Sequence, residues 1–460
     1  MVVSIRTRRK GFVGLFLTVV AAVSISSLFL SSQASAYPTA KQNYLISKNN
    51  VEKQNTNKLF EQGLALESAG EYKKAEAIWC QILQVEPKNS EAYLNLGNNL
   101  YHQRKIDQAI AAYRKTIEIN PNYADAYSNI GMMLGIQGKL DDAVVHFKKA
   151  IKIDPNHRLA NTGISIALRL QNKLDEAVVA YGKAIELDPE NTTLYLDLGD
   201  ILGRQNKLDE ALTAYSKATE INPGSSQAYV GVGNILTQQR KWEEAQTAYN
   251  KAIEIDPKNA YAWSSLSHGL RLNNNQQSAV SAARQAIKLN SKLTTAYNAL
   301  GAALGSQNQF DEAIFAYRQA LELDPNNSDI RTNLAEAYYY QNKFDEAFST
   351  VQDSIKQDGS AFSYALLGNI LQKQNKLDEA IEAYRQALNL PNELITTRPG
   401  ETDWVLTYSH AMAHNGLGLV LKQQGKLEAA IKEFELAISV DSDFMTAKEN
   451  LKQAQQRAKL

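Results

Sequence analysis

Polar and aromatic side chains recur along the chain at spacings that suit hydrogen bonding, and the chemistry they offer is binding. Amides, carboxylates, guanidinium groups and phenols supply donors and acceptors for the backbone of an extended peptide. We predict that they share one surface, at positions 9, 12 and 13 of a repeated unit; an ordinary solvated helix face is the alternative. The candidates are Asn98, Tyr101, Arg169, Asp200, Arg204, Asn234, His268, Arg271, Glu336, Tyr339, Tyr340, Asn369 and Lys373.

Residues that could support catalysis or hold a metal ion are sparse. No nucleophile with a matching base and no phosphate-binding glycine loop is found, so we expect no enzyme activity. His410 and His414 are four residues apart, a spacing that can hold a metal on a helix, but no acid or cysteine accompanies them in the right frame. We therefore expect no metal site and no cofactor.

The element that must position the candidates is a segment of 34 residues that recurs eleven times from Thr56 to Phe444. In the copy that begins at Ala124, positions 4, 7, 8 and 11 form an apolar face on one helix. Positions 20, 24 and 27 do the same on a second helix, and position 20 is alanine in every copy. Glycine or asparagine between the helices in nine copies predicts a left-handed residue there.

Glycine at position 8 of most copies indicates close packing. A glycine inside a helix costs roughly 1 kcal/mol relative to alanine, so its repetition predicts a neighbouring helix at close approach. One helix pair cannot bury its apolar face alone, so the pairs must stack. Repeat seven lacks this glycine and has Ala283 in place of the aromatic; unless Trp263 compensates, we expect its joints to be the softest.

These segments resemble the tetratricopeptide repeat family. The resemblance implies an all-α, right-handed α-solenoid of about eleven tandem helix pairs, with a concave surface that binds peptides or proteins. The charged tail, 445–460, is expected to form a capping helix. The residues at the signature positions of one copy are Tyr127, Ile130, Gly131, Leu134, Ala143, Phe147 and Pro155.

The first 36 residues are typical of an export signal. Four basic residues precede an apolar run from Gly11 to Leu30, and Ala34-Ser35-Ala36 offers a cleavage site. The run is also long enough to span a bilayer, so a retained anchor is the alternative. The expected order is then a signal or anchor (1–36), a polar spacer (37–55), repeats one to ten (56–394), an insertion (395–410), repeat eleven (411–444) and the capping helix (445–460).

The insertion is the most individual feature of the chain. Pro399-Gly400 predicts a turn, and Trp404, Tyr408 and Ala411 then follow at helical spacing. We expect the first helix of repeat eleven to begin early, near Thr402. Trp404 and Tyr408 are candidates for a second partner surface, with packing against the chain itself as the alternative.

The charge balance bears on the class of partner. The chain has 49 basic and 49 acidic side chains, and beyond residue 36 it has 45 basic and 49 acidic ones, which argues against nucleic acid. The repeats resemble those of exported bacterial proteins, some of which assist the assembly of membrane complexes or of the envelope. We expect a non-enzymatic scaffold, periplasmic or anchored to the outer face of the cytoplasmic membrane, that binds one or more membrane or envelope proteins. A glycan- or peptidoglycan-associated envelope element is the alternative.

Overall fold

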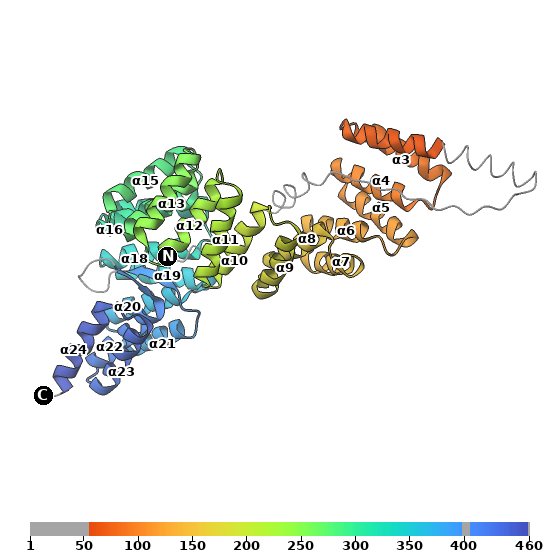
Figure 1. Cartoon of the computed structure of the whole chain (residues 1–460). Helices are drawn as coiled ribbons and strands as arrows, with labels where there is room; N and C mark the ends of the chain where they lie inside the picture. Colours follow the sequence, from red (N-terminus) through yellow and green to blue (C-terminus); the bar gives the residue numbers. More distant parts are fainter. Residues whose placement is uncertain (1–54, 398–404, 459–460) are drawn as a thin grey trace, which may run out of the picture. The chain divides into compact units, whose positions relative to one another are not determined.

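The computed structural model describes residues 55–397 and 405–458 (Figure 1). These residues form two compact units, which we call the N-terminal unit (55–205) and the C-terminal unit (206–458). The predicted export signal or anchor, nearly all of the predicted spacer, and Trp404 lie outside the described ranges. Within those ranges, no helix is both long enough and apolar enough to cross a membrane.

The N-terminal unit consists of helices that pack in consecutive pairs, each pair stacked on the next. In order they are a helix over residues 55–68, α3 (Tyr72–Val85), α4 (Ser90–His102), α5 (Ile106–Ile119), α6 (Ala124–Ile136), α7 (Leu140–Ile153), α8 (Arg158–Leu170), α9 (Leu174–Leu187) and α10 (Thr192–Arg204).

The C-terminal unit continues the series and ends on α24, which packs against α23 and buries Ala447 and Ala454. The predicted solenoid of helix pairs with a capping helix is thus confirmed. The elements are α11 (Leu208–Ile221), α12 (Ser226–Gln238), α13 (Trp242–Ile255), α14 (Ala260–Leu272), α15 (Gln276–Leu289), α16 (Thr294–Ser306), α17 (Phe310–Leu323), α18 (Ser328–Tyr340), α19 (Phe344–Asp358), α20 (Ala361–Lys373), α21 (Leu377–Leu388), β1 (Leu394–Thr397), β2 (Val405–Tyr408), α22 (Ser409–Gln423), α23 (Leu427–Val440) and α24 (Met445–Ala458).

The turn inside each repeat contains a left-handed residue, as predicted. Gly138 has φ 74° and Asn172 has φ 61°, and the other repeats follow the same rule. Arg104 and Arg240 adopt φ 61° and 60° at the same position. This conformation costs a residue with a Cβ roughly 1–2 kcal/mol, with glycine and asparagine as the usual exceptions. Arginine is therefore an unfavourable choice for the turn itself.

The position-8 glycines do mark a close approach, but the neighbour is an aromatic ring on the second helix of the same repeat. A Cβ on Gly131 would lie 2.9 Å from ring carbons of Phe147, and one on Gly163 of the next repeat would lie 2.4 Å from the same ring. Phe147 is fully buried between the two glycines. The same fit joins Gly97 to Tyr113, Gly233 to Tyr249, Gly301 to Tyr317, Gly368 to Tyr384 and Gly418 to Phe434.

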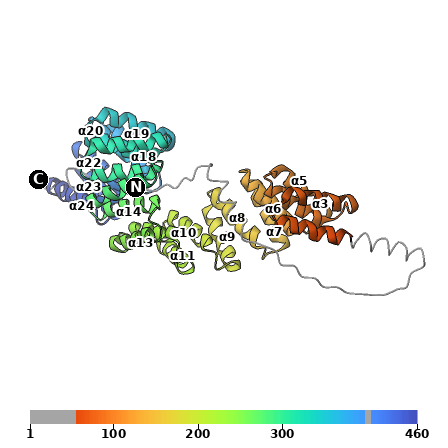
Figure 2. The ribbon, with the colours of Figure 1, turned by 90° about the horizontal axis from the view of Figure 1, so that it is seen from above.

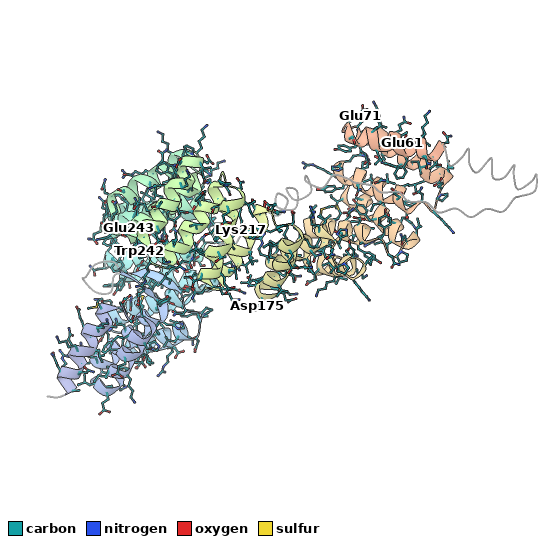
Figure 3. The ribbon with its side chains drawn as sticks, in the orientation of Figure 1. Glu61, Glu71, Asp175, Lys217, Trp242 and Glu243 are labelled. Atoms are coloured by element: carbon teal, nitrogen blue, oxygen red, sulfur yellow. The ribbon has the colours of Figure 1, made fainter. Side chains whose placement is uncertain are left out.

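A glutamine on each of several turns ties its repeat to the preceding one. Gln205 Nε2 donates to Asp175 Oδ1 at 2.8 Å, and Asp175 lies at the start of α9 (Figure 3). We call this set of bonds the glutamine ladder. Its other rungs join Gln137 to Asp107, Gln171 to Asp141, Gln239 to Asp209, Gln341 to Asp311 and Gln374 to Asp345.

Repeat seven, α14 and α15, lacks these devices. At the glutamine position of the ladder repeat seven has Asn273, and the preceding repeat has Glu243 at the aspartate position (Figure 3). At its own aspartate position repeat seven has Gln277. Trp263 does not replace the missing aromatic, because it is only half-buried and its Nε1 donates to the Pro257 carbonyl. Instead, small residues let α14 pack on both α12 and α16.

The described parts of the insertion pair as the two strands of a β-hairpin, so the expectation of a helix that begins near Thr402 and continues through Tyr408 is wrong. Val405–Tyr408 is a strand that pairs antiparallel with Leu394–Thr397, and α22 begins only at Ser409. The hairpin is closed at its base, where Ser409 N donates to the Glu393 carbonyl at 2.8 Å. Residues 405–408 are Val-Leu-Thr-Tyr, and β-branched and aromatic residues favour a strand. This preference outweighs the helical spacing of Trp404, Tyr408 and Ala411.

Candidate functional site

The candidate residues lie on the first helices of the repeats, and these helices form the more tightly packed layer of the solenoid. In the C-terminal unit, α14 contacts α12 and α16. In the same unit α20 contacts α18 and α22, and in the N-terminal unit α6 contacts α8 (Figure 2). No comparable contact joins second helices of consecutive repeats in the described residues. A two-layered stack curves toward its tighter layer, so the first helices lie on the inside of the curve within each unit.

In repeats two, six and ten, position 9 carries an asparagine whose side chain is locked in place by a tyrosine of the same repeat. Asn98 Oδ1 accepts hydrogen bonds from the Tyr113 hydroxyl at 2.9 Å and from Asn129 Nδ2 at 3.1 Å. Burial raises the pKa of Tyr113, which keeps its hydroxyl protonated as a donor. The same lock joins Tyr249 to Asn234 at 2.9 Å and Tyr384 to Asn369 at 2.7 Å.

This lock decides what the amides can offer to a ligand. Their oxygens are used, whereas the Nδ2 groups of Asn98, Asn234 and Asn369 have no hydrogen-bond partner among the described residues. An amide NH₂ held in a fixed direction can donate to a peptide carbonyl without losing rotamer freedom on binding. Sequence reasoning selected the asparagines and missed the tyrosines. The missed signal is an asparagine and a tyrosine 15 residues apart within one repeat.

Arg169 belongs to a buried network in the N-terminal unit. The Tyr181 hydroxyl donates to Asp197 Oδ2 at 2.8 Å and accepts from Arg169 Nε at 3.1 Å. Arg169 Nη2 lies 3.6 Å from the same carboxylate oxygen. Burial raises the pKa of Asp197, and the guanidinium opposes that rise. Arg169 therefore balances a buried carboxylate and contributes little free charge to a ligand.

The other candidates of the N-terminal unit are not gathered into one site. Tyr101 is buried, and its ring lies against His102 with a centroid distance of 5.4 Å. Arg204 is exposed and donates to Asn172, while Asp200 is half-buried.

In the C-terminal unit, Arg271 lies next to His268 and near Glu336 and Tyr317. Arg271 Nη2 lies 3.5 Å from His268 Nδ1, and Arg271 is buried. Burial lowers the pKa of Arg271, and the nearby Tyr317 and Glu336 oppose that shift. Burial, followed by the charge of Arg271, lowers the pKa of His268 well below its ordinary value, so this imidazole is neutral at pH 7.

Aromatic rings gather at the turn end of α18. Tyr339 packs edge-on against Tyr340 and Phe344, at centroid distances of 5.3 and 5.8 Å, and Tyr340 stacks on Phe310. Burial raises the pKa of Tyr339 to about 12. Lys373, at the end of α20, is exposed. The rings form an apolar edge where the inner layer meets the turns, since Tyr339 and Tyr340 end α18 and Phe310 and Phe344 begin α17 and α19. Lys373 places a cation one repeat farther along.

The predicted second partner surface is represented here by Tyr408 alone. Tyr408 is half-buried and packs against Ala411, Ala437 and Phe444, so its ring supports the last helices of the chain. His410 and His414 have separate partners, the Leu390 carbonyl and the Glu433 carboxylate. The described residues contain no group of three side chains that could hold a metal ion.

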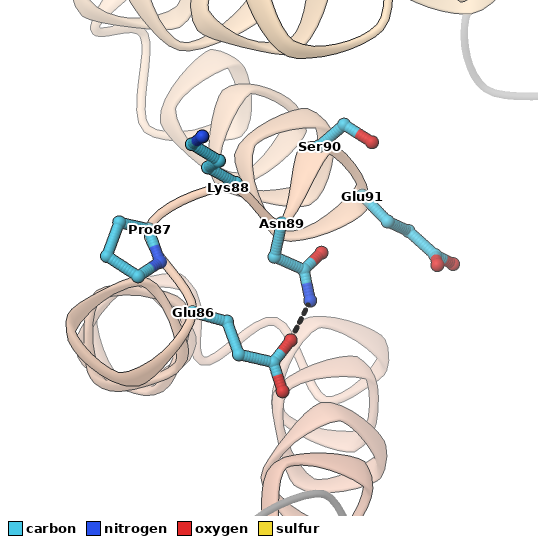
Figure 4. Close-up of a pocket in the computed structure, with 6 residues that line it drawn as sticks. All are labelled: Glu86, Pro87, Lys88, Asn89, Ser90 and Glu91. Atoms are coloured by element: carbon cyan, nitrogen blue, oxygen red, sulfur yellow. Dashed lines mark hydrogen bonds between the residues drawn. The ribbon is translucent and has the colours of Figure 1, made fainter.

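An open hollow lies away from the candidate surface, at the turn between α3 and α4 (Figure 4). Residues 86–91 line it, and Glu86 accepts a hydrogen bond from Asn89 Nδ2 at 2.8 Å. The amide also caps α4 by accepting from Ala92 N. These contacts explain the turn, and the hollow has no buried polar group directed into it.

Family models match three consecutive stretches of the chain. A tetratricopeptide repeat model matches 90–123 and 124–157, and a second tetratricopeptide repeat model matches 365–444. Between them, the model of the C-terminal domain of cilia and flagella-associated protein 70 matches 159–364. No curated protein matches the chain in sequence.

Two solved structures are similar in part. The crystal structure of the APC/C hetero-tetramer Cut9–Hcn1 has 15% identity and a TM-score of 0.47, and the match covers 87% of this chain and 96% of that one. The crystal structure of yeast Tom70 has 15% identity and a TM-score of 0.46, with 89% and 97% covered. The first model matches the helix pairs α4–α5 and α6–α7, so residues 90–157 and 365–444 consist of tetratricopeptide repeats, and the helix pairs between them share the same 34-residue period.

Proposed function

We propose that the chain is a non-enzymatic scaffold or assembly factor that holds segments of client proteins against the inner layer of first helices. A solenoid of such repeats is an architecture for protein–protein interaction, with an extended inner surface. The observation that carries the proposal is the set of position-9 amides. Tyrosine hydroxyls hold their oxygens inward and leave the Nδ2 groups for a ligand.

The place of action that we propose lies outside the bacterial cytoplasmic membrane, with a membrane or envelope protein as the client. The support is in the sequence: Arg6, Arg8, Arg9 and Lys10 precede an apolar run and a small-residue cleavage site. Sequencing the N-terminus of the mature protein tests this part. A new N-terminus at Tyr37 supports export and cleavage, whereas an intact Met1 on a protein in the cytoplasmic fraction contradicts it.

A crosslinking experiment tests the binding surface. A photoreactive amino acid replaces Lys373, which is exposed on the first-helix layer, or Phe315, which is 67% exposed on the second helix α17. Capture of one envelope protein from position 373 and not from position 315 supports the proposal. Equal capture from both positions contradicts it, and retention by purified cell-wall polymer alone favours the glycan-associated alternative.

Matched substitutions then test the amides themselves. Asn→Asp at positions 98, 234 and 369 keeps an oxygen for each tyrosine hydroxyl and removes the Nδ2 donor, whereas Asn→Ala removes both. We expect both triple variants to lose crosslinking, and only the alanine variant to lose stability as well. Unchanged crosslinking in the aspartate variant means that the amides do not contact the client.

A further inference from the structure

One ion pair in the C-terminal unit joins repeats that are far apart in the sequence. Arg240 Nη2 lies 3.6 Å from Asp441 Oδ2, and Arg240 Nη1 lies 3.3 Å from Asp443 Oδ2, across a separation of about 200 residues. In an open solenoid each repeat contacts only its neighbours. Arg240 is in the turn between α12 and α13 of repeat six, and Asp441 follows α23 of repeat eleven.

Both ends of this contact depart from the pattern of the other repeats. Asp441 is the residue that follows the second helix of its repeat. Asp154 and Asp256 stand at the same position in other repeats, and both are exposed. Asp441 is 5% exposed. A carboxylate is rarely buried unless its charge is paired and its oxygens accept hydrogen bonds. Arg240 supplies that paired charge from the position where most repeats have glycine or asparagine.

The β-hairpin supplies the remaining partner of the carboxylate. Thr407 on β2 is fully buried, and its hydroxyl donates to Asp441 Oδ2 at 2.6 Å. At the base of the hairpin, Ile395 on β1 is buried in the core of repeats ten and eleven. The hairpin is thus anchored at one strand and orients Asp441 with the other. This gives the insertion a role that no regular repeat needs.

We propose that Arg240, Asp441 and Asp443 form an electrostatic clasp that closes the C-terminal unit by joining repeat six to repeat eleven. Thr407 acts as the positioning residue, because it fixes the carboxylate that faces the arginine. With the clasp closed, repeats six to eleven form a loop whose two ends are tied together. When it opens, they form an ordinary flexible solenoid. A client protein would therefore have different access to the first-helix residues of these repeats when the clasp is closed and when it is open.

Distance measurements between spin labels test the clasp in the full chain. Thr247 on α13 and Ser439 on α23 are exposed and lie outside the clasp; each is replaced by cysteine in a Cys80→Ser background. At low salt we expect one narrow distance distribution. Arg240→Asn, or 1 M NaCl in the parent, should broaden it and shift it to longer distances, because screening acts within about 3 Å at that ionic strength.

Arg104→Asn is the matched control. Arg104 has the same left-handed conformation in repeat two and is exposed, so both substitutions favour the turn and only Arg240→Asn removes the clasp. Thr407→Val should broaden the distribution less than Arg240→Asn does. Circular dichroism checks that each variant keeps its helices.

Two results would overturn the proposal. One is a distribution in Arg240→Asn that matches the parent at low salt, since the ion pair then does not hold the repeats together. The other is a distribution in the parent that is already broad at low salt.

Discussion

Repeat three and repeat seven share one architecture, yet they hold their helices together differently. In repeat three, Phe147 lies between Gly131 and Gly163, and a rung of the glutamine ladder joins Gln137 to the repeat before. In repeat seven, Ala283 leaves no ring to enclose, and α14 approaches its neighbours through small residues. We call a ring enclosed by glycines, as Phe147 is, the aromatic key. Close approach of the helix backbones can thus replace the aromatic key, but it buries less apolar side-chain surface.

Each of the two repeats also contains a buried serine hydroxyl without a hydrogen-bond partner among the described residues, Ser128 in repeat three and Ser267 in repeat seven. Ser267 stands where repeat three has a glycine. An unsatisfied buried hydroxyl costs on the order of 1–3 kcal/mol. Because both repeats carry this cost, they differ in the enclosed ring and the ladder rung, which repeat three has and repeat seven lacks.

The largest effect is expected where the aromatic key is removed. Phe147→Ala should destabilise the N-terminal unit by about 3–5 kcal/mol, because the ring fills the space between two glycines that cannot close it. Urea unfolding and hydrogen exchange of α6 to α9 measure the loss. Val179→Ala is the control: that side chain is 75% exposed and its truncation should change little. A loss below about 1 kcal/mol for Phe147→Ala contradicts the key.

Glycine substitutions should separate the key from helix propensity. Gly163→Ala should destabilise by about 1–3 kcal/mol, because its Cβ would lie 2.4 Å from the Phe147 ring. Gly182→Ala should stabilise by about 0.4–1 kcal/mol, since nothing lies within 4 Å of its Cβ on α9. Thermal unfolding of the two variants measures both signs. If the two shifts have the same sign, the glycines are not kept for the ring.

Hydrogen exchange should be fastest over repeats six to eight, because repeat seven at their centre has no enclosed ring and makes no ladder rung with either neighbour. A single change, Gln277→Asp, should add a ladder rung with Gln307 and slow exchange in α15 and α16, by about 0.5–1.5 kcal/mol of opening free energy. An acid in the first turn of α15 also stabilises the helix by itself. A double-mutant cycle with Gln307→Ala isolates the rung, and a coupling of zero argues against it. Uniform protection across these repeats would contradict the prediction of a soft region.

The smallest effect concerns pH and position 9, where repeat seven has His268 instead of asparagine. Its folded pKa lies below the ordinary value of 6.5, so the unfolded chain binds the proton more readily. Stability is unaffected above pH 6.5 and falls as the pH drops below it. His268→Asn should reduce the loss between pH 7.5 and 5.5 in urea unfolding. An identical pH dependence in parent and variant would show that this imidazole is not responsible.

The sequence by itself determined the repeat and its turns. Apolar spacing, the alanine at position 20 and the glycine or asparagine at position 15 depend on residues within one helical hairpin. Local geometry and steric limits on φ act over a few residues, so a single sequence can express them. The sequence also predicts which helix face carries the candidate surface, because the helical period places position 9 on the side of the first helix that faces away from the packing residues.

Tertiary structure decided which groups meet. The tyrosine that locks Asn98 lies on the next helix, the ring against Gly163 comes from the preceding repeat, and Arg240 meets Asp441 across about 200 residues. The hairpin likewise took the extended form because β2 pairs with β1. Contacts of this kind depend on how helix pairs stack and curve. Spacing within one repeat does not contain that information, because small rotations between neighbours add up along the solenoid.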